Sequence, residues 1–429
     1  MEKLIVKNFL TLQDIEIDIK KINVIIGRQA EGKSILAKLV YFFRDFFNDY
    51  LNSIMNQQDK RQFDKRMKDK FLKIFPRYAW QKQKFEIKYL LNDFSISIIN
   101  QLSTTDRAGF KLTYSENLSG PRKQLATEWK KIVEQDISQD FNEKMQEFLP
   151  SLKDINLSLD GLIFMPAGRS FFAIIQDNIF SFLTSSIDID YFLSEFGSSY
   201  QFFKNVYKNE PVEQFDTKYF SKTRTIVNQI LSGQYQQERG RDYIYLETTN
   251  QKINISDASS GQQEFLPVAI ILILFPFVEK FGTLSSMLFI EEPEAHLFPL
   301  SQKRIIDLIA IVFNNAIKQS KKARFFLTTH SPYILTSLNN LIQAGNILKS
   351  INKHSDKNIR DKLKKQLFTI VDEDQILDIN DISAYMLQHG KLENIIDQET
   401  QLINATLIDE ISDEIGCTFD QLLALEIEE

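Results

Sequence analysis

The 429-residue sequence contains few of the residues on which disulfides and metal centres depend. Its one cysteine, Cys417, permits no internal disulfide and no cysteine-based zinc site, which fits a reducing compartment. The four histidines, His296, His330, His354 and His389, are scattered without the spacing of metal ligands. The sequence therefore gives no indication of a metal centre built from cysteine or histidine.

Long apolar runs and targeting segments are also missing. The longest nearly uninterrupted apolar run, residues 265–278, is shorter than a membrane span and contains two prolines, so we predict a buried core helix there. The N-terminal sequence MEKLIVKNFL alternates like a strand and lacks the apolar segment and cleavage site of a signal peptide. We expect a cytoplasmic protein with no membrane partner, whose 43% hydrophobic residues can bury two or three domain-sized cores.

Charge is unevenly distributed along the chain, although the net charge is only -6. Residues 371–429 contain sixteen Asp and Glu against one Lys, so residues 1–370 carry a net charge of +9. The acidic C-terminal region is predicted to be a solvated surface or, alternatively, a docking surface for a basic partner.

A phosphate-binding loop follows the third predicted strand. The sequence GRQAEGKS at residues 27–34 comes directly after the buried strand INVII and before a helical segment, which is the context that G-x-x-x-x-G-K-[ST] requires. The loop N–H groups and the helix N-terminus hold phosphates, Lys33 reaches the β and γ phosphates, and Ser34 ligates Mg²⁺. The predicted ATP-binding residues are Gly27, Arg28, Gln29, Ala30, Glu31, Gly32, Lys33, Ser34 and Ile35.

Polar residues follow two further predicted strands. Glu291 and Glu292 come after the apolar residues 287–290, where Glu291 would hold Mg²⁺ and Glu292 would polarise the attacking water. A histidine, His330, follows the strand ending in Thr328 and Thr329 and could bond the γ-phosphate. The simpler interpretations are a pair of solvated loop acids and a packed or surface histidine.

A polar turn with one glycine, DASSGQQ at residues 257–263, leads into the long apolar segment. Ser259, Ser260, Gly261 and Gln262 would form a helix N-terminus that favours an anion. The simpler interpretation is an ordinary serine N-cap of a core helix.

The order of these motifs resembles ABC-type ATPases, in the branch that contains RecF and the overcoming-lysogenization-defect proteins. The resemblance covers residues 1–47, 253–338 and the sequence IFMPAGRS at 163–170. It implies an α/β fold: an ABC-type P-loop ATPase head with a mixed β-sheet core and flanking helices, a helical lobe and a small C-terminal appendage. It also implies that residues 259–262 act in trans, as the signature motif that caps ATP bound to a second subunit. The expected assembly is a homodimer or higher homo-oligomer, with ATP and Mg²⁺ as cofactors.

The sequence departs from the ABC pattern at two points. Glu291 stands where many ABC ATPases have Asp, which is usual in this branch. No clear glutamine loop is present, and MPAGRS takes its place, so that Arg169 is either a phosphate or inter-subunit contact or a structural arginine.

We divide the chain into five parts on these patterns. They are residues 1–50, the ATPase core lobe with the P-loop; 51–154, an insertion with a basic helical segment and a β-hairpin; 155–252, a linker strand and the helical lobe; 253–345, the signature helix, Walker B and histidine-switch core; and 346–429, the acidic C-terminal region. Residues 60–84 contain ten Lys and Arg among five aromatic residues, which suits nucleic acid or, alternatively, a buried aromatic stripe with a basic outer face.

Two functions are compatible with these motifs. The first is an ATPase whose ATP-dependent dimerisation controls a separately encoded nuclease or toxin, because the chain resembles ATPases of bacterial anti-phage systems of the Septu and PARIS types. The second is a RecF-like DNA-binding ATPase of repair or recombination. Catalysis is assigned to Glu292, Glu291, His330 and Lys33, and Mg²⁺ to Ser34 and Glu291.

Overall fold

The computed structural model describes most of the chain. The described residues are 2–101, 109–135, 140–154, 160–172, 190–209, 216–238, 240–277, 285–319, 321–404 and 416–423. Parts of the predicted helical lobe (173–189 and 210–215) and of the acidic C-terminal region (405–415 and 424–429) lie outside them. Within the described part, no helix is long and apolar enough to cross a membrane.

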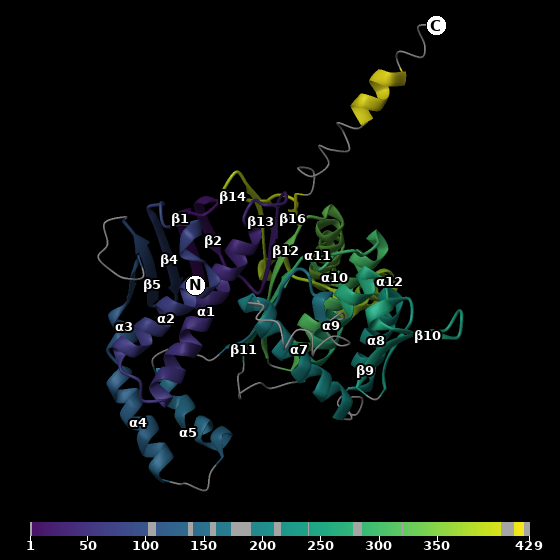
Figure 1. The fold of residues 1–429 in the computed structure, drawn as a ribbon. Helices are drawn as coiled ribbons and strands as arrows, with labels where there is room; N and C mark the ends of the chain where they lie inside the picture. The colour runs from purple at the N-terminus through teal and green to yellow at the C-terminus, as the bar shows by residue number, and fades with distance from the viewer. Residues whose placement is uncertain are drawn as a thin grey trace.

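One mixed sheet organises the molecule (Figure 1). Its eleven described strands lie in the order β6-β5-β4-β1-β2-β14-β13-β3-β12-β11-β7. The antiparallel part consists of β1 (Glu2–Phe9), β2 (Leu12–Asp18), β4 (Phe85–Leu91), β5 (Phe94–Asn100) and β6 (Lys111–Tyr114). The remainder comprises β3 (Ile22–Ile26), β7 (Asp160–Met165), β11 (Ser285–Glu291), β12 (Lys322–Thr329), β13 (Ile382–Gln388) and β14 (Lys391–Asn394). Asn92 adopts φ 51° in the tight turn between β4 and β5, which confirms the predicted hairpin.

Side chains alternate between the two faces of the sheet, and each face has its own core. Met287 and Phe289 of β11 pack into one core, and Leu288 and Ile290 into the other. On the first face lie α1 (Lys33–Met55), α2 (Lys60–Ile74), α3 (Glu116–Ser119), α4 (Arg122–Gln135) and α5 (Phe141–Asp154), the last two extending away from the sheet in Figure 1. On the second face lie α7 (Tyr191–Asn209), α8 (Thr217–Leu231), α9 (Ser260–Leu274), α10 (Pro299–Lys318) and α11 (Pro332–Lys353).

Smaller elements complete the second face. A three-stranded sheet of β8 (Gln234–Glu238), β9 (Arg241–Leu246) and β10 (Gln251–Asn254) follows α8. The helix α12 (Lys357–Ile370) packs on α11, and β15 (Ile396–Asp397) pairs with β16 (Leu402–Ile403). Of the predicted helical lobe, the described helices α7 and α8 lie on this second face.

The register of the parallel strands determines where the motifs meet. Thr329 of β12 pairs with Ile26 of β3, and Glu291 of β11 pairs with Thr328 of β12. All three strands run in the same direction, so the segments that follow them leave from the same edge of the sheet. This edge receives the loop at 27–34, the acids at 291–294 and His330.

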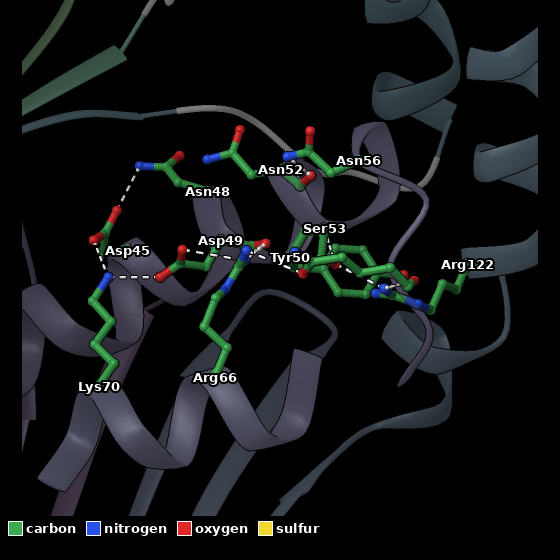
Figure 2. A network of polar contacts seen from close by, with 11 residues as sticks. Asp45, Asn48, Asp49, Tyr50, Asn52, Ser53, Asn56, Arg66, Lys70 and Arg122 are labelled. Carbon is green, nitrogen blue, oxygen red and sulfur yellow. Dashed lines mark hydrogen bonds and ion pairs between the residues drawn. The ribbon is translucent and has the colours of Figure 1, made fainter. Parts of the chain in front are cut away.

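The basic segment at residues 60–84 is a structural element built on α1. Of its five aromatic side chains, Phe63, Phe71, Phe75 and Trp80 are buried and only Tyr78 is exposed. Lys70 forms ion pairs with Asp45 and Asp49 of α1, and Arg66 donates to the Asp49 carbonyl at 2.6 Å (Figure 2). The interpretation as a buried aromatic stripe is therefore confirmed, and these four rings are not free to stack on bases.

The C-terminal region enters the sheet, contrary to the expectation of a separate appendage from residue 346 onward. β13 pairs in parallel with β3 and antiparallel with β14, which connects to β2. Residues 382–394 form a hairpin that belongs to the core of the sheet. Before it, Asp372 caps a 3₁₀ turn, Glu373–Gln375, and pairs with Lys222.

We predict that a chain ending at Asp381 does not fold cooperatively, because it lacks the two strands that join β3 to β2. A chain ending at Asn404 keeps every described strand of the large sheet and is the matched control. Thermal unfolding followed by circular dichroism distinguishes the two. A cooperative transition of the shorter chain at the temperature of the longer one would contradict the central position of β13.

Candidate nucleotide site

The glycines of the phosphate-binding loop are required by close contacts and by backbone conformation. Gly32, the N-cap of α1, adopts φ 105°, and no side chain caps this helix. A Cβ on Gly27 would lie 2.3 Å from the Leu387 carbonyl oxygen of β13, closer than any real contact. Arg28, Gln29 and Ala30 are exposed at the rim. The loop thus packs against β13 on one side, and its residues 28–30 are exposed on the other. No side chain caps the first N–H groups of α1, which can therefore bind phosphate.

Lys33 lies under this loop and is almost fully buried. Its Nζ donates to the carbonyls of Gly27 at 2.8 Å and Arg28 at 2.7 Å and lies 3.1 Å from Nδ1 of His330. Burial lowers the pKa of Lys33, and the nearby carboxylates, Glu292 foremost, oppose that shift. Three acceptors match the three hydrogens of an ammonium group, so Nδ1 of His330 is an acceptor.

His330 connects Lys33 to the catalytic candidate Glu292. With Nδ1 as acceptor, the neutral ring carries its hydrogen on Nε2, which lies 3.0 Å from Oε1 of Glu292. The backbone of Glu292 is left-handed, with φ 45°, a conformation that costs a non-glycine residue about 1–3 kcal/mol. The structure therefore brings Lys33, His330 and Glu292 into one chain of contacts.

A third acid, Glu294, supports this chain and was missed in the sequence. Its Oε1 accepts hydrogen bonds from Oγ1 of Thr329 at 2.6 Å and from the backbone N–H of His330 at 2.7 Å. The carboxylate is buried and positions His330 through the backbone N–H of that residue. The sequence indicates this residue only as the third acid of EEPE at residues 291–294. The roles assigned to Glu291 and Glu292 gave no reason for a third acid.

Glu291 is suited to a divalent cation. Its Oε2 accepts from the Ala167 N–H at 3.1 Å, and its Oε1 is buried with no hydrogen-bond partner. Ser34 is exposed in the first turn of α1. In the described part of the chain no cluster of three or more His, Cys, Asp or Glu could hold a metal by itself. These residues fit Mg²⁺, which keeps water and phosphate ligands and takes one or two from protein.

The polar turn at the start of α9 is a capping box, as its simpler interpretation states. Ser259 caps the helix, the Gln262 side chain accepts from the Ser259 N–H at 3.0 Å, and Ser260 is exposed. A Cβ on Gly261 would lie 2.6 Å from the His296 carbonyl oxygen, so the turn also packs on the loop that follows Glu294. Among the described residues no hydrogen bond joins this turn to residues 27–35.

Arg169 is a structural arginine in this structure, not a surface contact. Its side chain is 1% exposed, so neither a phosphate nor a second subunit can reach it. The guanidinium donates to the carbonyls of Pro166, Glu291 and Glu292 and forms an ion pair with Glu264. The second of the two interpretations from the sequence is the one that the geometry favours.

We predict that Glu294→Ala lowers both stability and activity. The change leaves the Thr329 hydroxyl and the His330 N–H without acceptors, and each buried unsatisfied group costs about 1–3 kcal/mol. Denaturant unfolding should show a loss of about 2 kcal/mol or more, and the ATPase rate should fall because His330 is no longer held. Glu393→Ala, which removes an exposed acid of β14, is the control. If Glu294→Ala unfolds at the same denaturant concentration and hydrolyses ATP at the same rate as the wild type, Glu294 does not support His330.

Comparison with known proteins identifies the family. Residues 1–335 match the family model described as AAA ATPase domain. No curated protein matches the sequence. Similar solved structures include the SMC head domain from Thermotoga maritima (10% identity, TM-score 0.32, covering 78% of this chain and 90% of that one). They also include the recombination mediator RecF bound to ATP (11% identity, TM-score 0.29, covering 91% and 98%). These scores are low, and the assignment rests on the family match and the P-loop geometry: the chain belongs to the AAA ATPase domain family and is an ATPase.

Proposed function

We propose that this ATPase acts as a pair of identical subunits that close on ATP, and that the closed pair controls a separately encoded effector. The observation that carries the proposal is the start of α9, where Ser259 and Ser260 are exposed. Its N–H groups form a helix N-terminus, the apolar helix behind it is anchored in the core, and the turn has no bond to its own phosphate-binding loop. In the ABC-type arrangement that the motifs resemble, such a turn contacts ATP held by the other subunit.

The residues of one subunit have separable roles in hydrolysis. Lys33, now bonded to the Gly27 and Arg28 carbonyls, would turn to the phosphates and release Nδ1 of His330. His330 would keep Glu292 oriented through Nε2, while the carboxylate of Glu292 orients and deprotonates the attacking water. Ser34 and Glu291 would hold Mg²⁺, which stabilises negative charge on the phosphate oxygens.

The regulatory part of the proposal rests on the resemblance to ATPases of bacterial anti-phage systems, which work beside a separate nuclease or toxin. DNA binding in the manner of RecF has less support. Its main support was the aromatic segment at residues 60–84, whose rings are core residues apart from Tyr78.

We predict that Glu292→Gln forms a stable dimer with ATP, because the amide keeps the shape of the site but cannot accept the proton of water. Sedimentation with and without ATP measures the assembly. Adding Ser260→Glu should abolish the dimer, since a carboxylate at this exposed position would face the partner's ATP. Adding Ser119→Glu, at the partly exposed end of α3, is the control and should leave the dimer intact.

Dilution provides an independent test of the dimer. The wild-type rate per molecule should fall as the protein is diluted below its dimerisation constant. A monomeric Glu292→Gln with bound ATP, together with a rate per molecule that is flat on dilution, would overturn the proposal.

The effector half of the proposal is tested by co-expression with the product of the neighbouring gene. We expect the wild-type ATPase to suppress a nuclease or toxin activity of that product. Lys33→Met, which cannot hold the phosphates, should alter the suppression. Purified ATPase that cleaves DNA by itself, with activity unaffected in Lys33→Met and Glu292→Gln, would contradict this half.

A further inference from the structure

The backbone of Glu292 is held in its left-handed conformation from two sides. Its N–H donates to the Thr328 carbonyl of β12 at 2.8 Å. Its own carbonyl accepts from Nη2 of Arg169 at 3.0 Å, and Nη1 of Arg169 donates to the preceding carbonyl, that of Glu291, at 2.5 Å. A φ of 45° is uncommon for a residue with a side chain, so it needs such fixed partners. Arg169 therefore bonds both carbonyls at the point where the Glu292 side chain leaves the strand.

Arg169 is itself held by α9. Its guanidinium is buried, and its counter-charge is the buried carboxylate of Glu264, 3.4 Å from Nε. That carboxylate also accepts from the backbone N–H groups of Arg169 at 3.0 Å and Ser170 at 3.1 Å, and Nε reaches the Glu264 carbonyl at 3.3 Å. Five donors in a planar fork allow one arginine to bond two chain segments at once.

Glu264 lies one turn into α9, two residues after the capping box at 259–262. This first turn is also fixed at Gly261, whose Cα has no room for a Cβ beside the His296 carbonyl. The start of α9 and the segment from Glu291 to His296 are thus joined at two separate points.

We propose that Arg169 is a positioning residue for Glu292 and that, with Glu264, it makes the first turn of α9 and the end of β11 one rigid unit. On the proposed function, on which this inference rests, that turn touches the ATP of the partner. A shift of this turn on contact with the partner's ATP would then move the catalytic carboxylate of the subunit's own site with it, so hydrolysis at the two sites would be coupled.

The test begins with Arg169→Lys, which keeps the positive charge but loses the planar fork. We expect kcat to fall by about 100-fold, the effect of displacing a catalytic group by about 1 Å, with KM for ATP unchanged because the phosphate-binding loop is intact. Glu264→Gln should show the same pattern. The ATP dependence of the wild-type rate should be cooperative, with a Hill coefficient that falls to about 1 in both variants. A wild-type kcat in Arg169→Lys, or cooperativity that survives both changes, would overturn the proposal.

A double-mutant cycle separates positioning from loss of folded protein. In the Glu292→Gln background, Arg169→Lys should leave the residual single-turnover rate unchanged, since no carboxylate remains to be positioned. A merely structural role would lower both rates by the same factor. Arg122→Lys is the matched control. It replaces another buried arginine, at the start of α4, which donates to Oγ of Ser53 (Figure 2) and to the Gln58 carbonyl. It should lower the melting temperature and leave kcat unchanged.

The role of Arg169 and the proposed dimer can be disproved separately. If Glu292→Gln assembles with ATP while Arg169→Lys turns over normally, the inference fails and the proposed dimer stands. If Glu292→Gln stays monomeric, the proposed dimer fails, and the cycle still measures whether Arg169 acts through Glu292.

Discussion

The burial of charge at one edge of the sheet is the constraint on which the site depends. Two cations, Lys33 and Arg169, lie among the four carboxylates of Glu264, Glu291, Glu292 and Glu294, most of them shielded from water. A buried charge is tolerated only when it is paired and hydrogen-bonded, and removing one partner of a buried pair typically costs about 3–5 kcal/mol. Lys33 and Arg169 each donate most of their hydrogen bonds to backbone carbonyls. The hydrogen bonds that stabilise the buried charge therefore also fix the backbone of the segments that accept them.

The pairing leaves negative charge in excess. The four carboxylates outnumber the two cations, and Oε1 of Glu291 and Oε2 of Glu294 are buried without hydrogen-bond partners. Bare ATP would be repelled by this excess, whereas a divalent cation between the acids and the phosphates would reverse the repulsion. On the proposed function, these charges would favour nucleotide bound together with Mg²⁺ over nucleotide alone.

Sequence patterns predicted the local parts of this arrangement and not the parts that depend on distant contacts. The loop at 27–34, the acids after β11 and His330 were recognisable, because each follows a short apolar strand and parallel strands bring their ends together. β13 was not recognised as a central strand, because it is embedded in an acidic region and its partner β3 lies about 360 residues earlier in the chain. Glu294 and the buried state of Arg169 depend on how loops from different strands meet. That information is not periodic and leaves no pattern in a single sequence.

The proline inside α9 is best understood together with the link to Arg169. Pro267 has no N–H, so the Gln263 carbonyl cannot accept the helical hydrogen bond from residue 267. The next residue, Glu264, binds Arg169 through its carboxylate and its carbonyl. The turn that lacks one helical hydrogen bond is therefore held by Arg169, which also bonds the end of β11. The apolar residues that follow keep the rest of the helix in the core.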